Sequence, residues 1–229
     1  MIFNHKSPAF QEIWNKNTKR RKRNKYNGAY YYSKEICELM IPRIETDRNW
    51  FTVHVQGIMK NHSIVFIHEM FKYERYNDLK DCNDLVLVIS HLHQYEHVKD
   101  LGKVIWLPMS VDTKYLEQFK APKTKDVAYI GRSDKLKGLT LPQGIDYICD
   151  MPREQLLKEM AKYKQVYAVD RTAIEAMYLG CKVLPFDPRY PDPETTWFVL
   201  DSRQAAKMLQ LQLCELKWKE AEAQENSSL

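Results

Sequence analysis

The sequence predicts an α/β protein built on parallel β-sheets. Short apolar runs of strand length alternate with segments of helical character along most of the chain. Leu85–Ser90 is a continuous apolar run, which is typical of a strand buried on both faces. The alternation begins again after a hinge-like stretch at Gln118–Lys125, which contains a proline and three lysines. Alternating strands and helices indicate parallel sheets with helices on both sides.

Residues 1–117 are expected to form a first lobe. Its predicted strands are Trp50–Gln56, Ser63–His68, Leu85–Ser90 and Val104–Leu107. Its segments with helical potential are Tyr30–Met40, Met70–Leu79 and His91–Leu101. Gly102 ends the last of these segments, as glycine commonly does at the C-terminus of a helix.

Residues 118–229 are expected to form a second lobe that ends in a helix. Its predicted strands are Val127–Ile130, Val166–Val169 and Lys182–Phe186. Its predicted helices begin at Pro152, at Thr172 and at Asp201, and Gly180 ends the second of them. In parallel sheets of this kind, ligands bind at the carboxyl ends of the strands.

Composition indicates a globular protein of the cytoplasm. The chain has 229 residues, of which 44% are hydrophobic and 28% are charged, so it can bury a sizeable core. No stretch resembles a signal peptide or a membrane span. The five cysteines are odd in number and form no CxxC pair, which favours reduced thiols over a disulfide framework.

The positive charge is concentrated in one segment near the N-terminus. Seven of the ten residues in Lys16–Lys25 are basic, and removing these seven charges from the net charge of +5 leaves −2 for the rest. Such a cluster favours contact with a polyanion, although a solvated arm has the same composition. The candidate contact residues are Lys19, Arg20, Arg21, Lys22 and Arg23.

A first candidate phosphate-binding element follows the predicted strand Val127–Ile130. Gly131 comes directly after it and allows the backbone to approach a ligand closely. Arg132 and Lys137 then supply two cations that can face one diphosphate. A glycine and an arginine after a strand are common, so this element alone is a weak signal.

A second candidate element is the predicted helix that begins near Thr172. Its first turn, with Thr172 and Ala173, offers backbone N–H groups and the positive end of the helix dipole to a phosphate. Glu175 lies one turn into the helix and could accept hydrogen bonds from ribose hydroxyls. The alternative is that Glu175 only stabilises the helix dipole.

Taken together and in this order, these stretches resemble the C-terminal lobe of GT-B glycosyltransferases. The matching segments are Gly131-Arg132, Lys137-Gly138, Met151–Leu156 and Glu175–Val183, and Val104–Asp112 is similar to the family's interlobe segment. The resemblance implies two Rossmann-like lobes and a nucleotide-diphosphate sugar, with a UDP-sugar favoured. It also implies that Arg132 and Lys137 hold the phosphates, that Glu175 holds the ribose, and that no metal is needed.

The sequence departs from the family in two places. Retaining members of the best-known GT-B family carry a second acid about eight residues before the helix glutamate, and this chain has Tyr167 there. The stereochemical outcome is therefore open. The chain is also short for two full lobes, so the N-terminal lobe is expected to be trimmed.

His68 is the candidate catalytic residue. It follows a predicted strand, where the resemblance places an acceptor-side histidine, and an imidazole can take a proton near neutral pH. The alternative is a solvent-facing histidine at the end of a strand. His91, His93 and His97 suggest zinc, but they lack a carboxylate or cysteine at standard spacing, which favours a helix surface instead.

The acceptor is the least determined part of this interpretation. The basic segment and the tyrosines beside it suggest double-stranded DNA, with a hydroxymethylated base as acceptor, as in phage DNA modification. A basic segment also suits an enzyme that acts on an anionic lipid or wall polymer. A non-catalytic nucleic-acid-binding module on the same fold is the third possibility.

Overall fold

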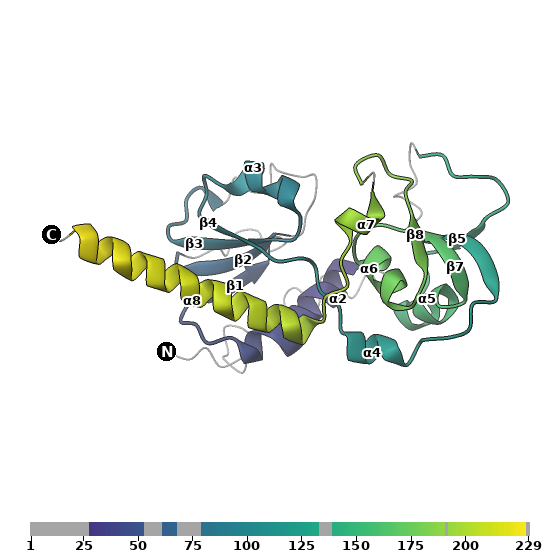
Figure 1. Ribbon diagram of the computed structural model, residues 1–229, viewed down its shortest axis with the longest axis horizontal. Helices are drawn as coiled ribbons and strands as arrows, with labels where there is room; N and C mark the ends of the chain where they lie inside the picture. Colours follow the sequence, from purple (N-terminus) through teal and green to yellow (C-terminus); the bar gives the residue numbers. More distant parts are fainter. Residues whose placement is uncertain (1–27, 53–60, 68–78, 133–138, 191, 228–229) are drawn as a thin grey trace. The chain divides into compact units, whose positions relative to one another are not determined.

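The computed structural model of the chain describes residues 28–52, 61–67, 79–132, 139–190 and 192–227 (Figure 1). These residues contain two four-stranded parallel β-sheets and several helices, which confirms the predicted α/β class. The chain divides into two compact units. The first unit takes the described residues within Ile36–Pro108 and Arg203–Leu229, and the second takes those within Ile13–Glu35 and Met109–Ser202.

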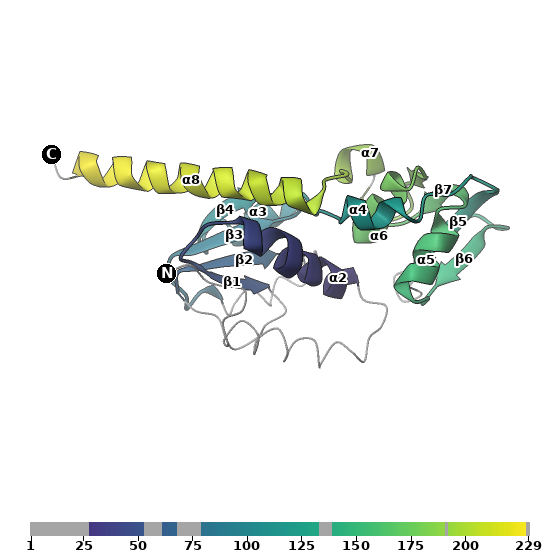
Figure 2. The same ribbon diagram turned by 90° about the horizontal axis from the view of Figure 1, so that it is seen from below.

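The sheet of the first unit has the order β1-β2-β3-β4, and every neighbouring pair is parallel (Figure 2). Its strands are β1 (Asn49–Thr52), β2 (Ser63–Ile67), β3 (Leu85–Ile89) and β4 (Lys103–Trp106). All residues of β2 and β3 are buried, as the apolar runs predict for the central strands of a parallel sheet.

The helical elements of the first unit are short, with one exception. They are η1 (Ile36–Met40), η2 (Ile41–Arg43), η4 (Leu92–Gln94), α3 (Tyr95–Val98) and the 26-residue helix α8 (Ser202–Ser227). In α8, Ala205, Ala206, Leu209 and Leu213 are buried. The side chain of Gln212 donates a hydrogen bond to the carbonyl of Trp106 at the end of β4.

The position of α8 differs from the predicted division of the chain at residue 117. The apolar face that contains Leu209 and Leu213 belongs to the first unit, whereas the sequence suggested that it would belong to the second lobe. An apolar helix face indicates that a helix is buried, but it does not identify the sheet that covers it. The chain therefore passes between the units after Glu35, after Pro108 and after Ser202.

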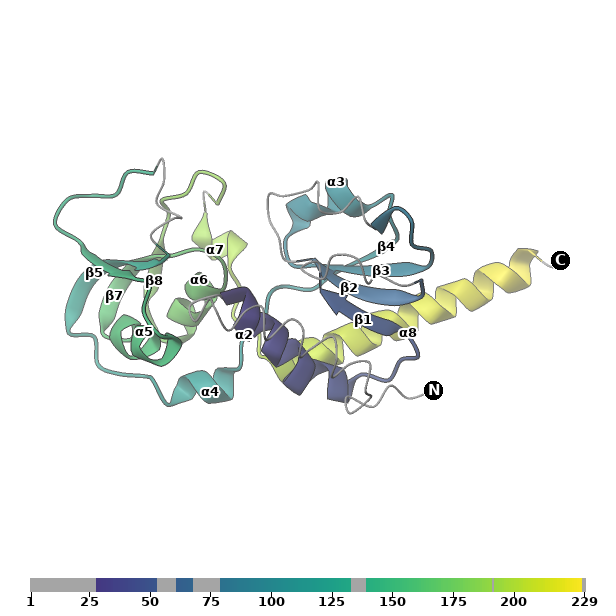
Figure 3. The same cartoon turned by 180° about the vertical axis from the view of Figure 1, so that it is seen from behind.

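The sheet of the second unit has the order β6-β5-β7-β8, again with only parallel pairs. Figure 3 labels β5, β7 and β8 of this sheet. Its strands are β5 (Lys125–Gly131), β6 (Asp146–Cys149), β7 (Tyr163–Tyr167) and β8 (Lys182–Leu184). Its helices are α2 (Gly28–Glu35), α4 (Thr113–Glu117), α5 (Arg153–Met160), α6 (Asp170–Tyr178) and α7 (Pro193–Thr196). The connections through α5 and α6 run across the sheet in the same direction, so right-handed crossovers place both helices on one face.

Lys123 joins the C-terminal ends of α5 and α6. Its Nζ donates hydrogen bonds to the carbonyls of Ala161, at 2.8 Å, and Leu179, at 2.7 Å. These carbonyls belong to the negative ends of two helix dipoles, so a cation stabilises both. Gly180 follows α6 with φ +82°, a conformation that favours glycine.

No disulfide joins any of the five cysteines, all of which lie in described residues. In the part of the chain that the structure describes, no helix has both the length and the apolar character needed to span a bilayer.

Replacing Lys123 with methionine should destabilise the second unit. The change leaves the carbonyls of Ala161 and Leu179 without their charged donor, at a cost of about 1–3 kcal/mol. The midpoint of thermal unfolding, followed by circular dichroism, should fall by roughly 4–8 °C for a loss of about 2 kcal/mol. Lys164→Met is the control, because Lys164 is exposed and pairs with the equally exposed Asp126. Equal midpoints for the two variants would contradict the capping role.

Candidate functional site

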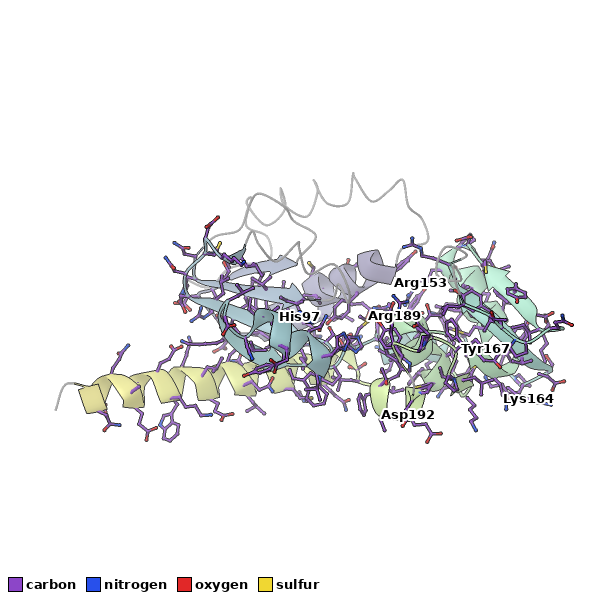
Figure 4. The ribbon with its side chains drawn as sticks, turned by 90° about the horizontal axis from the view of Figure 1, so that it is seen from above. His97, Arg153, Lys164, Tyr167, Arg189 and Asp192 are labelled. Carbon is purple, nitrogen blue, oxygen red and sulfur yellow. The ribbon has the colours of Figure 1, made fainter. Side chains whose placement is uncertain are left out.

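An arginine follows each of the four strands of the second sheet. Arg132 comes directly after β5, Arg153 begins α5 after β6, Arg171 lies in the first turn of α6 after β7, and Arg189 lies in the loop after β8. Because the strands are parallel, these residues follow the same edge of the sheet. In Figure 4, Arg153 and Arg189 lie away from Lys164, which is near the amino end of β7. This carboxyl edge is the candidate site.

Two of these arginines form a buried cluster with two glutamates. Glu175 Oε1 accepts hydrogen bonds from Arg153 Nη1, at 2.5 Å, and from Arg171 Nε, at 2.6 Å. Arg171 Nη2 donates to Glu35 Oε1, and Arg153 Nη2 lies 3.7 Å from the same oxygen. We call Glu35, Arg153, Arg171 and Glu175 the arginine–glutamate cluster. Each of the four residues is at most 9% exposed, so this is a buried ion network of balanced charge.

Local sequence explains part of this cluster. Arg171 and Glu175 are four residues apart on α6, a spacing that places them on one face of a helix. The guanidinium of Arg153 lies over two aromatic rings. Its central carbon is 4.4 Å from the ring centroid of Tyr31 and 5.7 Å from the ring centroid of Tyr115. A flat guanidinium can stack on rings and bind carboxylates at the same time, which a lysine ammonium does less well.

The cluster extends through two serines. Glu35 Oε2 accepts a hydrogen bond from Ser202 Oγ at 3.3 Å, and Ser202 Oγ lies 3.1 Å from Ser110 Oγ. Glu35, Ser110 and Ser202 each lie within two residues of a point where the chain enters or leaves the second unit. The network therefore fixes these three chain segments to one another inside the second unit.

The two carboxylates of the cluster keep the buried Arg171 guanidinium charged. Burial alone would lower the pKa of Arg171, but Glu175 and Glu35 outweigh burial and raise that pKa, so the guanidinium stays charged. Within the described part of the chain, Arg153 Nη2 and Arg171 Nη1 are buried and have no hydrogen-bond acceptor. Each of the two arginines in the cluster thus has one buried nitrogen whose N–H groups are not used in a hydrogen bond.

The predicted phosphate-binding strand end is present as β5. Gly131 is its last residue, and a Cβ there would lie 2.8 Å from the hydroxyl of Tyr129. That hydroxyl donates to the carbonyl of Arg132 at 2.8 Å. A side chain at position 131 would therefore displace the Tyr129 hydroxyl from this hydrogen bond. Arg132 is half-buried, and Lys137 lies outside the described residues.

The predicted second element is α6, which begins at Asp170, two residues before the expected start at Thr172. Asp170 has φ +55°, a conformation that few residues other than glycine adopt and that aspartate tolerates better than most. Thr172 is half-buried and Ala173 is fully buried, so only the backbone of Ala173 could meet a ligand. Glu175 is 2% exposed, and its role at a ribose stays a prediction.

The loop after β8 adds residues that the sequence did not indicate. The buried carboxylate of Asp187 accepts from Arg189 Nε at 2.8 Å and Nη2 at 2.5 Å. Tyr190 donates to Asp170 Oδ1 at 3.4 Å, which joins this loop to the start of α6. Burial raises the pKa of Tyr190, and the charge of Asp170 adds to this effect. The sequence signal was weak, because this stretch is rich in proline and looks like a simple loop.

Tyr167 belongs to a row of aromatic residues across the sheet. Tyr129 is directly opposite Tyr147 on β6 and Tyr167 on β7, so the three tyrosines share a face. Phe186 packs edge-on against Tyr129 and Tyr167, with ring centroids 5.6 Å and 6.0 Å away. Tyr167 thus has a packing role in this sheet.

The remaining candidate residues are in or near the first unit. His68 and the basic residues Lys19, Arg20, Arg21, Lys22 and Arg23 lie outside the described residues. His91 is buried before η4, whereas His93 and His97 are exposed. His97 is labelled in Figure 4. Among the residues that the structure describes, no group of three or more histidine, cysteine or acidic side chains could hold a metal ion.

The chain matches no protein-family model, no curated protein and no solved structure.

Replacing Glu175 with alanine should strongly destabilise the second unit. The change leaves Arg153 and Arg171 with a single carboxylate, and breaking a buried ion pair from one side costs about 3–5 kcal/mol. The free energy of unfolding, measured by urea titration, should fall by that amount. Glu154→Ala is the control, because Glu154 is exposed on α5. A loss below about 1 kcal/mol in Glu175→Ala would show that the cluster does not support the fold.

Proposed function

We propose that this protein is a glycosyltransferase of the GT-B type that binds its donor at the carboxyl edge of the second sheet. It would move a sugar from a nucleotide-diphosphate sugar, with a UDP-sugar favoured, to an acceptor hydroxyl. One observation carries the proposal: Gly131 ends β5, and Arg132, the start of α6 and Glu175 follow strand ends on the same edge of the parallel sheet. Ligands of such sheets bind at this edge.

Binding of the diphosphate is assigned to Arg132, to Lys137 and to the first turn of α6. The charges of Arg153 and Arg171 are already neutralised by Glu35 and Glu175. The role assigned to these two arginines is therefore to position the carboxylate of Glu175. α6 has nine residues and no side-chain cap at its start, so its dipole and first N–H groups can support a phosphate. These cationic and dipolar groups support a leaving diphosphate without a metal ion.

Binding of the ribose is assigned to Glu175. Two arginines hold one of its oxygens, at 2.5 Å and 2.6 Å, so the carboxylate has a fixed position before any ligand arrives. A preorganised acceptor binds a hydroxyl without the cost of ordering a mobile side chain.

The acceptor side is assigned to His68 as the proton acceptor and to the basic segment as a contact for a polyanion. The favoured acceptor is a hydroxymethylated base in DNA, reached in the cytoplasm. Seven basic residues within ten favour this contact, because each can neutralise one backbone phosphate.

Replacing Arg132 with alanine should weaken binding of a UDP-sugar by about 10- to 150-fold. This range corresponds to the loss of one charge-assisted contact of about 1.5–3 kcal/mol. Isothermal titration calorimetry at low salt measures the affinity. Lys164→Ala is the matched control, since it removes a cation near the amino end of β7, away from the carboxyl edge of the sheet. Wild-type protein that binds no nucleotide diphosphate, or equal affinities for both variants, would contradict the donor site.

Changing Lys19, Arg20, Arg21, Lys22 and Arg23 together to glutamine should flatten the salt dependence of DNA binding. Each lost phosphate contact reduces the magnitude of the slope of log affinity against log salt by about 0.9, so the loss of five contacts should reduce it by about 4.5. Fluorescence anisotropy with duplex DNA measures it, and UDP-sugar affinity is the internal control. Wild-type protein that binds anionic vesicles but not DNA would assign the segment to a lipid acceptor.

A further inference from the structure

Helix α8 carries a second apolar surface on the side away from its buried residues. Leu211 is 70% exposed and Trp218 is 64% exposed, and the two side chains are two helical turns apart on one face. Leu209 and Leu213, which are buried, lie on the opposite face. Exposed apolar side chains that share one face of a helix can form a contact surface for another molecule. We call Leu211 and Trp218 the outer stripe of α8.

The second half of α8 buries no described side chain, and two ion pairs at the surface join it to the rest of its unit, Glu220 with Lys103 and Lys217 with Asp47. Leu213 is the last buried residue of the helix, and those from Cys214 to Asn226 are exposed or half-buried. A helical segment of this length is marginally stable in water without tertiary contacts. A partner on the outer stripe would supply these contacts.

Charge is distributed unevenly along this exposed face. Lys207 lies before the outer stripe, and Glu222 and Glu225 lie after it, all three being exposed. Between them, Glu215 is already paired with Lys219 at 2.7 Å. One end of the face is therefore basic and the other end is acidic.

Two copies of this face have complementary charges only when the two α8 helices are antiparallel. In an antiparallel pair of α8 helices, Lys207 of each copy lies near Glu222 and Glu225 of the other, and Leu211 lies against Trp218. In a parallel pair, each charge would lie beside its like. The acidic end also opposes adsorption to an anionic membrane.

From these features we infer that two copies of the chain associate through the outer stripes of α8 in antiparallel orientation. The contact is isologous, because the same residues from both copies form it. The inference goes beyond the proposed activity and does not depend on it, since α8 from Arg203 onward belongs to the first unit.

The test of the apolar contact is sedimentation equilibrium of the full chain over a range of concentrations. Wild-type protein should dimerise, whereas Leu211→Glu and Trp218→Glu should each be monomeric at the same concentration. Both side chains are exposed, so both variants should keep the cooperative unfolding of the two sheets, and the loss of helical circular dichroism should be limited to the unpaired end of α8. Leu92→Glu is the matched control: Leu92 is 65% exposed in the same unit, and its variant should remain dimeric. A monomeric wild type, or variants that still dimerise, would overturn the inference.

The test of orientation is a charge reversal at low salt. Lys207→Glu should raise the dimer dissociation constant by about tenfold, because each of two symmetric contacts becomes repulsive. Adding Glu222→Lys and Glu225→Lys to this variant should restore the wild-type constant. In a parallel dimer like charges would face each other in the wild type and in both variants, so a Lys207→Glu dissociation constant equal to that of the wild type would overturn the antiparallel arrangement. Failure of the combined variant to restore the wild-type constant would overturn it as well.

Discussion

The arginine–glutamate cluster is the interaction on which the second unit depends. A buried guanidinium is tolerated only beside a carboxylate, because removing an isolated charge from water costs several kcal/mol. Glu175 and Glu35 meet this requirement for Arg153 and Arg171. Since these four residues come from α2, α5 and α6, neutralising their charges fixes the relative positions of three helices.

The same cluster links stability to the proposed function. Glu175 has a fixed position because two arginines bind it, and the start of α6 is held near the end of β6 by the same contacts, since Arg153 begins α5 there. Arg132 lies outside this cluster and follows β5 on the same edge. The edge therefore combines a rigid buried scaffold with a further cation beside it, which is what binding of a diphosphate requires.

Much of this fold could be predicted from the sequence, but the pairing inside the site could not. Strands β2 and β3 could be predicted because strands that are buried on both faces appear in the sequence as continuous apolar runs, and all residues of both strands are buried. Strand β6 was missed because only Ile148 in it is buried, so no run appears. The partners of Glu175 and Arg171 were missed for a different reason. Arg153 is 22 residues from Glu175, and Glu35 is 136 residues from Arg171, and local patterns contain no information about such contacts.

The central claim is that a nucleotide-diphosphate sugar binds at the carboxyl edge of the second sheet. Hydrogen–deuterium exchange of the full chain, with and without a saturating UDP-sugar, tests it most directly. The donor should slow amide exchange at Gly131 and Arg132 and in the first turn of α6, from Asp170 to Ala173, with little change in β1–β4. Protection confined to the first unit, or no protection anywhere, would contradict it.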